Sequence, residues 1–271
     1  MRRRALLLAV ASAACARAAP RQSFAASALA AARSAVRVDA DGERFYWREL
    51  ERLTALARER LERGASLDRA LRELIFDDRG FQREVVDTDL RFVLLPSVLR
   101  DRRGSCVGLG SLYLALTEAL GRAARGVLRP GHFYVRLEHA GAHTNVELLR
   151  RGEAMSDAWY DGRFPVPSGG GGEYGRPLTA DECVGVIEFN VGNQRRRERR
   201  LEEARAAYAR AVQHFPRFAE AHASLGAALH LLGRADEARA SYQAAQRLDP
   251  RLPHLDRHLR LLEADRAGVG P

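Results

Sequence analysis

The sequence of 271 residues contains no lysine, so all 44 of its basic side chains are arginine, and it has only 3 cysteines and 2 tryptophans. So few cysteines exclude a scaffold held together by disulfides. Hydrophobic residues make up 46% of the chain and charged residues 29%, which excludes a disordered, collagen-like or multi-span membrane protein and predicts a soluble one. The length allows one large or two modest domains.

The formal net charge of +9 raises the question of nucleic-acid binding. The densest basic run, residues 195–200, contains a glutamate and has no neighbouring aromatic side chain on which bases could stack. The use of arginine in place of lysine throughout, beside abundant Ala, Gly and Leu, is typical of a GC-rich coding bias. Net charge alone is also weak evidence for a nucleic-acid partner. We therefore expect no nucleic-acid partner.

The first 19 residues have the pattern of a secretory signal peptide. Arg2–Arg4 are positively charged, residues 5–14 are apolar, and Ala16–Ala18 offers an A-x-A cleavage motif. The apolar stretch is too short to span a bilayer. We expect an exported protein of the periplasm or cell envelope with no transmembrane helix in the mature chain. A twin-arginine signal in the arginine run and lipid attachment at Cys15 are alternatives.

Helical periodicity dominates residues 43–120. Apolar residues recur at helical spacing over 43–63 and again after a Ser66 cap, and a short helical turn is predicted at 96–99. A longer helix over 106–120 is apolar nearly all round. Such a helix is expected at the centre of its domain.

Two alternating runs, 133–137 and 144–148, predict a β-hairpin joined at His139 to Gly141. A tight turn centred on His139 and Ala140 would place His132 opposite Glu147 and Tyr134 opposite Asn145. The side chains expected to face the core are those of Phe133, Val135, Leu137, Val146 and Leu148.

Cys106, His132 and Glu147 form the candidate site. Cys106 follows the expected N-cap Ser105, and unpaired amides and the helix dipole favour a thiolate in the first helical turn. A carboxylate facing His132 would hold the imidazole in one tautomer, as the base of a thiol nucleophile requires. If the register of the hairpin is shifted by two residues, Asn145 takes the place of Glu147 opposite His132. The alternative is that none of the three is catalytic. Cys106 would then be a small buried residue, His132 a strand-edge histidine with its hydrogen bonds satisfied, and Glu147 a solvent-facing acid.

Residues 161–178 are predicted to be a loop, and the glycine run at 169–172 a flexible connection. Thr179 and Glu182 form a capping-box pattern that starts a new helix. Cys183, early in that helix, is interpreted as packing, with a disulfide to Cys106 as the alternative. His139 and His143 span the hairpin turn without a third ligand, so we expect no metal site and no cofactor.

From Gly185 the sequence repeats with a period of 34 residues, the separation of Gly192 and Gly226. The other paired positions are Ala204 and Ala238, Tyr208 and Tyr242, Ala211 and Ala245, and Pro216 and Pro250. This pattern resembles tetratricopeptide repeats, although Glu188 and His222 replace the usual large first-helix residue. A polar helix over 255–265 would cap the array.

Four motifs in the first half resemble the transglutaminase-like superfamily. They are Arg-Arg-Gly-Ser-Cys at 102–106, Pro-Gly-His-Phe-Tyr-Val-Arg at 130–136, Asn-Val-Glu at 145–147, and Met-Ser-Asp-Ala-Trp-Tyr at 155–160. The similarity extends to a bacterial group in which such a domain precedes tetratricopeptide repeats. We therefore expect a signal peptide at 1–19, a transglutaminase-like domain at 43–165, a linker at 166–179, and two repeats with a capping helix at 180–267.

The resemblance implies an α+β fold with a papain-like core, in which a central helix bearing the cysteine packs on an antiparallel sheet. It also implies acyl transfer through a thioester, or hydrolysis of an amide or peptide bond. Cys106 would then be the nucleophile, His132 the base and Glu147 the orienting acid. The sequence departs from the family after Glu147, where the usual threonine and paired glycines are replaced by Leu-Leu-Arg-Arg-Gly.

Two further functions compete with an enzyme. One is an adaptor without catalytic activity, in which the repeats bind a protein or peptide. The other is a structural protein of the envelope, which a freely jointed linker would favour. Two repeats and a cap are fewer than such arrays usually need alone, so we expect the array to dock on the first domain.

Overall fold

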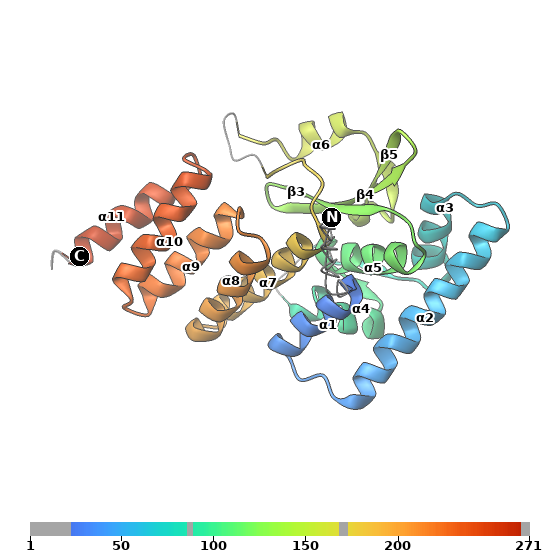
Figure 1. The fold of residues 1–271 in the computed structure, drawn as a ribbon, viewed down its shortest axis with the longest axis horizontal. Coiled ribbons are helices and arrows are strands. Elements are labelled where there is room, and N and C mark those ends of the chain that lie inside the picture. The colour runs from blue at the N-terminus through green and yellow to red at the C-terminus, as the bar shows by residue number, and fades with distance from the viewer. Residues whose placement is uncertain (1–22, 86–88, 168–172, 267–271) are drawn as a thin grey trace, which may run out of the picture.

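The computed structural model describes residues 23–85, 89–167 and 173–266. The fold is α+β, with an antiparallel sheet in the first half of the chain and a helical array in the second (Figure 1). The expected signal peptide at 1–19 and the glycine run at 169–172 lie outside the described residues. Within those residues, no helix combines the length and the hydropathy that crossing a membrane requires.

The first half comprises α1 (Phe24–Ala35), α2 (Ala40–Glu62), α3 (Leu67–Arg72) with a π-helical continuation (Glu73–Asp78), β1 (Gln82–Arg83), a 3₁₀ turn (Leu90–Phe92), α4 (Leu95–Asp101), β2 (Arg103–Gly104), α5 (Cys106–Ala119), β3 (Ala124–Arg129), β4 (His132–His139), β5 (Ala142–Glu147), a 3₁₀ turn (Leu148–Arg150), β6 (Glu153–Met155) and α6 (Asp157–Arg163). The second half comprises α7 (Ala180–Arg197), α8 (Leu201–His214), α9 (Ala219–Leu231), α10 (Ala235–Leu248) and α11 (Leu255–Arg266).

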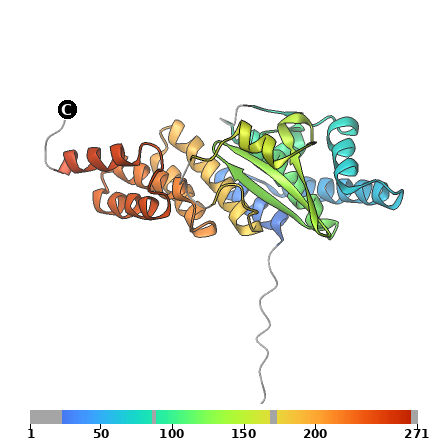
Figure 2. The ribbon, with the colours of Figure 1, turned by 90° about the horizontal axis from the view of Figure 1, so that it is seen from above.

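Helices cover both faces of the four-stranded sheet, whose order is β3-β4-β5-β6. Helix α5 packs on one face, and α6 lies over the other (Figures 1 and 2). The α6 side buries Val127, Tyr134 and Tyr160 in a cluster of their own. The predicted core positions of the hairpin, Phe133 and Val135 among them, are buried on the α5 side, as the alternation requires.

The predicted register of the hairpin is wrong by two residues. Asn145 pairs with Arg136 rather than Tyr134, and His139 pairs with Ala142, so the turn is centred on Ala140 and Gly141. Gly141 adopts a φ of +79°, a conformation that an L side chain rarely takes. The turn therefore forms where the glycine is available, one residue later than the sequence analysis places it.

Other elements were not predicted from the sequence. Strands β3 and β6 flank the predicted hairpin, and α1 precedes the predicted start of the first domain at residue 43. Helix α6 extends to Arg163, into the range expected to be loop. By contrast, the helices predicted over 43–63 and 106–120 are confirmed by α2 and α5.

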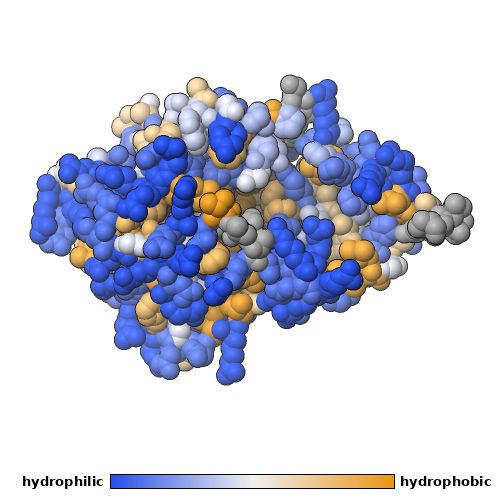
Figure 3. Space-filling view, turned by 180° about the vertical axis from the view of Figure 1, so that it is seen from behind, coloured by the Kyte–Doolittle hydropathy of each residue, from blue (hydrophilic) through white to orange (hydrophobic). Residues whose placement is uncertain are grey.

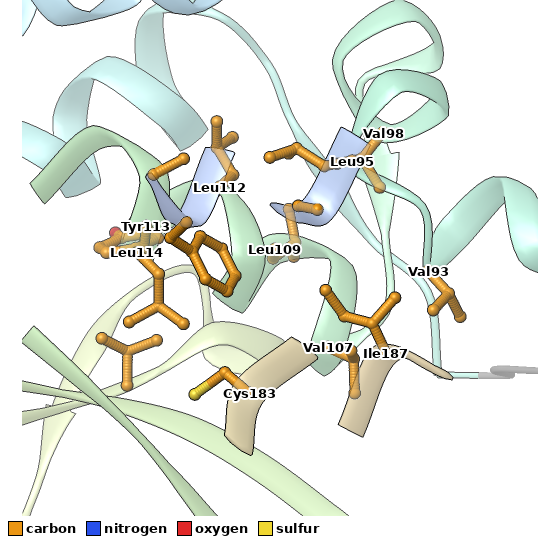
Figure 4. Close-up of a cluster of buried hydrophobic side chains, with 14 of the residues drawn as sticks. Val93, Leu95, Val98, Val107, Leu109, Leu112, Tyr113, Leu114, Cys183 and Ile187 are labelled. Carbon is orange, nitrogen blue, oxygen red and sulfur yellow. The ribbon is translucent and has the colours of Figure 1, made fainter. Parts of the chain in front are cut away.

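The hydrophobic core is continuous between the sheet and the first repeat helix. One cluster of buried side chains runs from Phe24 in α1 through α5 to Phe218 at the start of α9. Figure 4 shows Val107 of α5 beside Ile187 of α7, with Cys183 nearby. The expected docking of the array on the first domain is confirmed by this shared core.

Cys183 has the packing role expected from the sequence. It is 3% exposed, and a β-carbon at Gly126 would collide with its sulfur and with the ring of Phe133. Burial raises the pKa of the Cys183 thiol to about 12. No disulfide joins Cys183 to Cys106, because the two cysteines are present as thiols.

The repeat pattern of the sequence is confirmed by the helix pairs. Gly192 and Gly226 lie so close to the rings of Tyr208 and Tyr242 that a β-carbon would collide with them. Helix α8 ends at His214 and α10 at Leu248, in each case two residues before the expected proline.

The arginine-rich end of α7 is engaged in contacts within the chain. Arg195 is buried, binds the carbonyl of Ala35 and pairs with Glu198 at 2.7 Å. Arg200 pairs with Glu203 at 2.7 Å. Figure 3 shows the face opposite to that of Figure 1, where hydrophobic areas are scattered among hydrophilic ones.

Glu188 explains one departure from the repeat pattern. Its carboxylate is buried, accepts two hydrogen bonds of 2.9 Å from the guanidinium of Arg210, and lies 3.3 Å from the hydroxyl of Ser34 in α1. The acid thus joins α7 to α8 and to α1. A large apolar residue could not make these bonds.

Replacing Glu188 with alanine should lower the free energy of unfolding by about 1–3 kcal/mol, because a partly buried guanidinium loses its partner. Urea unfolding followed by tryptophan fluorescence measures the change. The control is Glu202→Ala, whose exposed pair with Arg205 should cost less than about 1 kcal/mol. Equal losses in the two variants would contradict this role for Glu188.

Candidate active site

A cavity of about 420 Å³ contains the predicted nucleophile and base. Cys106 lies at the start of α5 and His132 at the start of β4, and both side chains line this cavity. A larger hollow of about 770 Å³ lies between α2, α4 and α7, and none of the predicted site residues lines it. The chemistry predicted from the sequence therefore belongs to the smaller cavity.

The position of Cys106 is fixed by the start of α5. The hydroxyl of Ser105 accepts a hydrogen bond from the N–H of Gly108, which confirms Ser105 as the N-cap. The N–H and hydroxyl of Ser105 both donate to the carbonyl of Phe92, at 2.8 and 3.1 Å. Cys106 is half-buried in the first turn of α5. The first N–H groups of a helix have no carbonyl partner within the helix, so they favour a negative charge at this position.

The structure brings His132 and Glu147 together. Nε2 of His132 lies 2.7 Å from Oε2 of Glu147, and each side chain is 2% exposed. Because the register differs from the predicted one, Glu147 approaches His132 diagonally across the hairpin rather than from the opposite position. The second carboxylate oxygen accepts a hydrogen bond of 2.9 Å from the N–H of Leu149.

This arrangement determines which nitrogen of His132 can act as a base. A carboxylate accepts hydrogen bonds, so Nε2 carries the proton that faces Glu147. The lone pair of the neutral ring is then on Nδ1. Phe164 stacks on the imidazole with ring centroids 4.1 Å apart and planes 7° apart, which fixes the ring orientation.

Tyr160 and Phe164 were not predicted as site residues, although Tyr160 belongs to one of the recognised motifs. Tyr160 stacks on Tyr134 with ring centroids 3.7 Å apart, and its buried hydroxyl has no hydrogen-bond partner among the described residues. Burial, followed by the nearby charge of Glu147, raises the pKa of Tyr160 well above its usual value. The aromatic residues therefore give His132 and Glu147 a dry, uncharged cover.

Asn145 belongs to a different network. Its amide oxygen accepts from Nε of Arg136 at 2.8 Å, and its amide nitrogen donates to Asp157 at 2.9 Å. Partial burial acts to raise the pKa of Asp157, but the hydrogen bond from Asn145 and the charge of Arg136 lower it below the usual range. This network attaches the start of α6 to the sheet, whereas Glu147 contacts His132.

Arg129 is a third site residue that was not predicted from the sequence. It is buried at the end of β3, lines the cavity and donates to Asp161 at 2.7 Å. Its Nε has no hydrogen-bond partner among the described residues, and Gly175 lies against its guanidinium. No sequence pattern marks it, because its burial depends on the segment that returns after α6.

The hairpin histidines have partners other than a metal. His139 lies 3.2 Å from the hydroxyl of Thr144, and His143 lies 3.0 Å from Asp157. Within residues 23–85, 89–167 and 173–266, no group of three His, Cys, Asp or Glu side chains is placed to hold a metal ion.

Two family models match parts of the chain. Residues 45–164 match the family model described as the transglutaminase-like superfamily. Over these residues the chain is similar to a transglutaminase-like domain. Residues 192–253 match the tetratricopeptide repeat, so the expected order of the two domains is confirmed. No curated protein matches the chain. The transglutaminase-like match includes Cys106, His132, Glu147 and Phe164, whereas α1 lies outside it.

The contacts of Glu147 and Asn145 predict different effects on Cys106. Glu147→Gln should shift the pH dependence of Cys106 alkylation by iodoacetamide toward the free-cysteine value of about 8.5, because the amide cannot stabilise a charged imidazole. Asn145→Ala should leave that profile unchanged. The rate is measured on the peptide that contains Cys106. A shift caused only by Asn145→Ala would show that Asn145 orients the histidine.

Proposed function

We propose that the transglutaminase-like domain is a cysteine-dependent acyl transferase or amide hydrolase. The observation that supports this most directly is the buried pair of His132 and Glu147, joined at 2.7 Å beside the cavity that Cys106 also lines. Burying two ionisable groups is costly unless they are paired and hydrogen-bonded. A base held in one tautomer is what a thiol nucleophile needs.

In the first step, Nδ1 of His132 takes the thiol proton, and the sulfur of Cys106 attacks the carbonyl carbon of an amide or peptide bond. The carbon–nitrogen bond then breaks, and the imidazolium returns the proton to the departing amine. The products are a thioester on Cys106 and free ammonia or a free amine. Glu147 stabilises the imidazolium that forms between these events.

In the second step, water or a second amine attacks the thioester, and His132 accepts a proton from the attacking group. The carbon–sulfur bond breaks and Cys106 leaves as a thiolate. Attack by water completes a hydrolysis, and attack by an amine completes an acyl transfer. We assign the stabilisation of the oxyanion to N–H groups in the first turn of α5, the backbone amide of Cys106 among them.

The unusual sequence after Glu147 is compatible with catalysis. Residues 148–150 form a 3₁₀ turn, and the N–H of Leu149 in this turn binds Oε1 of Glu147. The chain then reverses through Arg151 and Gly152 into β6. The departure from the family pattern therefore leaves the carboxylate of Glu147 held by a backbone amide and in contact with His132.

We also propose export to the periplasm or cell envelope, on the basis of the signal pattern at residues 1–19. The tetratricopeptide repeats are an architecture that binds proteins or peptides, and we assign them the recruitment of a substrate or partner.

An activated cysteine can be detected without a known substrate. In the full chain, Cys106 should react with iodoacetamide at neutral pH faster than an ordinary thiol, with a thiolate titrating well below about 8.5. His132→Ala should remove that shift and slow the reaction at pH 7 by about tenfold or more. The labelled peptide is quantified by mass spectrometry. If Cys106 of the wild-type chain instead shows the pH dependence of an ordinary thiol, the proposed enzymatic function is refuted.

Turnover provides a second test. The wild-type chain should release ammonia from some members of a panel of glutamine- and asparagine-containing peptides, and Cys106→Ser should release none. Circular dichroism establishes that the variant is folded. If Cys106→Ala keeps every partner captured by the wild-type chain, and no condition yields turnover, the adaptor is the better description.

A further inference from the structure

One wall of the candidate active-site cavity belongs to the repeats. Helix α7 contributes Val186, Phe189, Asn190 and Asn193, which are three, four and seven residues apart and so lie on one helical face. Phe218 and Glu220, at the start of α9, also belong to this wall, as do Leu252 and Pro253 after α10. A substrate that reaches Cys106 therefore lies against repeat residues.

Glu220 is the acidic side chain on this wall. It is half-buried, and burial raises its pKa to about 7, with a backbone hydrogen bond opposing the rise and the charge of Asp249 adding to it. No basic side chain among the described residues opposes that rise. Nearby carboxylates differ in this respect, since Glu173 pairs with Arg176 and Arg217, and Glu182 pairs with Arg176.

Aromatic side chains surround the same space. Phe189 and Phe218 lie with ring centroids 4.8 Å apart, and Tyr174 and Phe133 also line the cavity. A carboxylate beside aromatic rings is the combination that binds ammonium and guanidinium groups. Arg129, the guanidinium that lines the cavity, is occupied by Asp161 at 2.7 Å.

We propose that Glu220 makes the repeat array select substrates that carry a positively charged group, an ammonium or a guanidinium, beside the carbonyl that Cys106 attacks. This inference rests on the proposed function of Cys106. It makes the array part of the substrate site, in addition to any partner that its outer surface binds.

Charged thiol reagents test the proposal without a known substrate. Trimethylammonioethyl methanethiosulfonate is cationic, and sulfonatoethyl methanethiosulfonate is anionic. Each transfers its thioalkyl group to the Cys106 thiolate, forming a disulfide and releasing methanesulfinate. At pH 8, where Glu220 is ionised, Glu220→Gln in the full chain should lower the ratio of cationic to anionic rates at Cys106 about fivefold, because the charges act within a screening length.

Two variants serve as controls. Glu202→Gln removes the same charge from the outer surface of α8, where Glu202 pairs with Arg205, and should leave the ratio unchanged. Glu220→Asp keeps the charge and should restore most of the ratio, which separates a charge effect from a folding defect. An unchanged ratio in Glu220→Gln, with a stability loss alone, would overturn the proposal and leave Glu220 as a residue that stabilises the start of α9.

The neutral reagent methyl methanethiosulfonate distinguishes this proposal from the proposed function. If Cys106 is not activated, the neutral reagent reacts at the rate of an ordinary thiol in every variant, and the enzyme is refuted. Both proposals are supported if the neutral reagent reacts fast and equally with the wild type and Glu220→Gln, while the ratio of the cationic to the anionic rate differs between them. A high neutral rate with an unchanged ratio refutes only the role of Glu220.

Discussion

The burial of helix α5 is the constraint on which the rest of the structure depends. Its side chains are apolar on almost every side, so it is stable only where other elements cover it completely. The sheet covers one side, α1, α2 and α4 cover others, and α7 covers the remaining part. Because α7 is also the first repeat helix, the same burial that completes the core brings the repeats to the end of α5 that carries Cys106.

The second requirement is the satisfaction of a buried acid. Glu147 is buried away from solvent, and its two carboxylate oxygens bind His132 and the N–H of Leu149. Phe164 and Tyr160 close the space above them. A carboxylate and an imidazole held in this way resist reorientation.

The repeats differ from a free-standing array in ways that follow from this docking. Glu188 replaces the usual large residue and connects α7 to α8 and α1 through Arg210 and Ser34. The face of α7 that lines the cavity turns toward Cys106 rather than toward solvent. A freely jointed pair of domains is therefore inconsistent with the shared core, and the structural protein that such a linker would favour loses its support.

The sequence by itself determined the local features. Ser105, the capping box at Thr179 and the small residues at Gly192 and Gly226 each act within a helix or between neighbouring helices, so spacing was enough to predict them. Tertiary structure decided the hairpin register, the strands β3 and β6, the burial of α1 and the positions of Arg129 and Glu220 beside the cavity. These features depend on segments distant in the chain, and an arginine or a glutamate has no local pattern that reveals burial. The contact of His132 with Glu147 was predictable only in part. The alternation of the strands placed both side chains on one face of the sheet, whereas the turn at Gly141 determined that they meet diagonally.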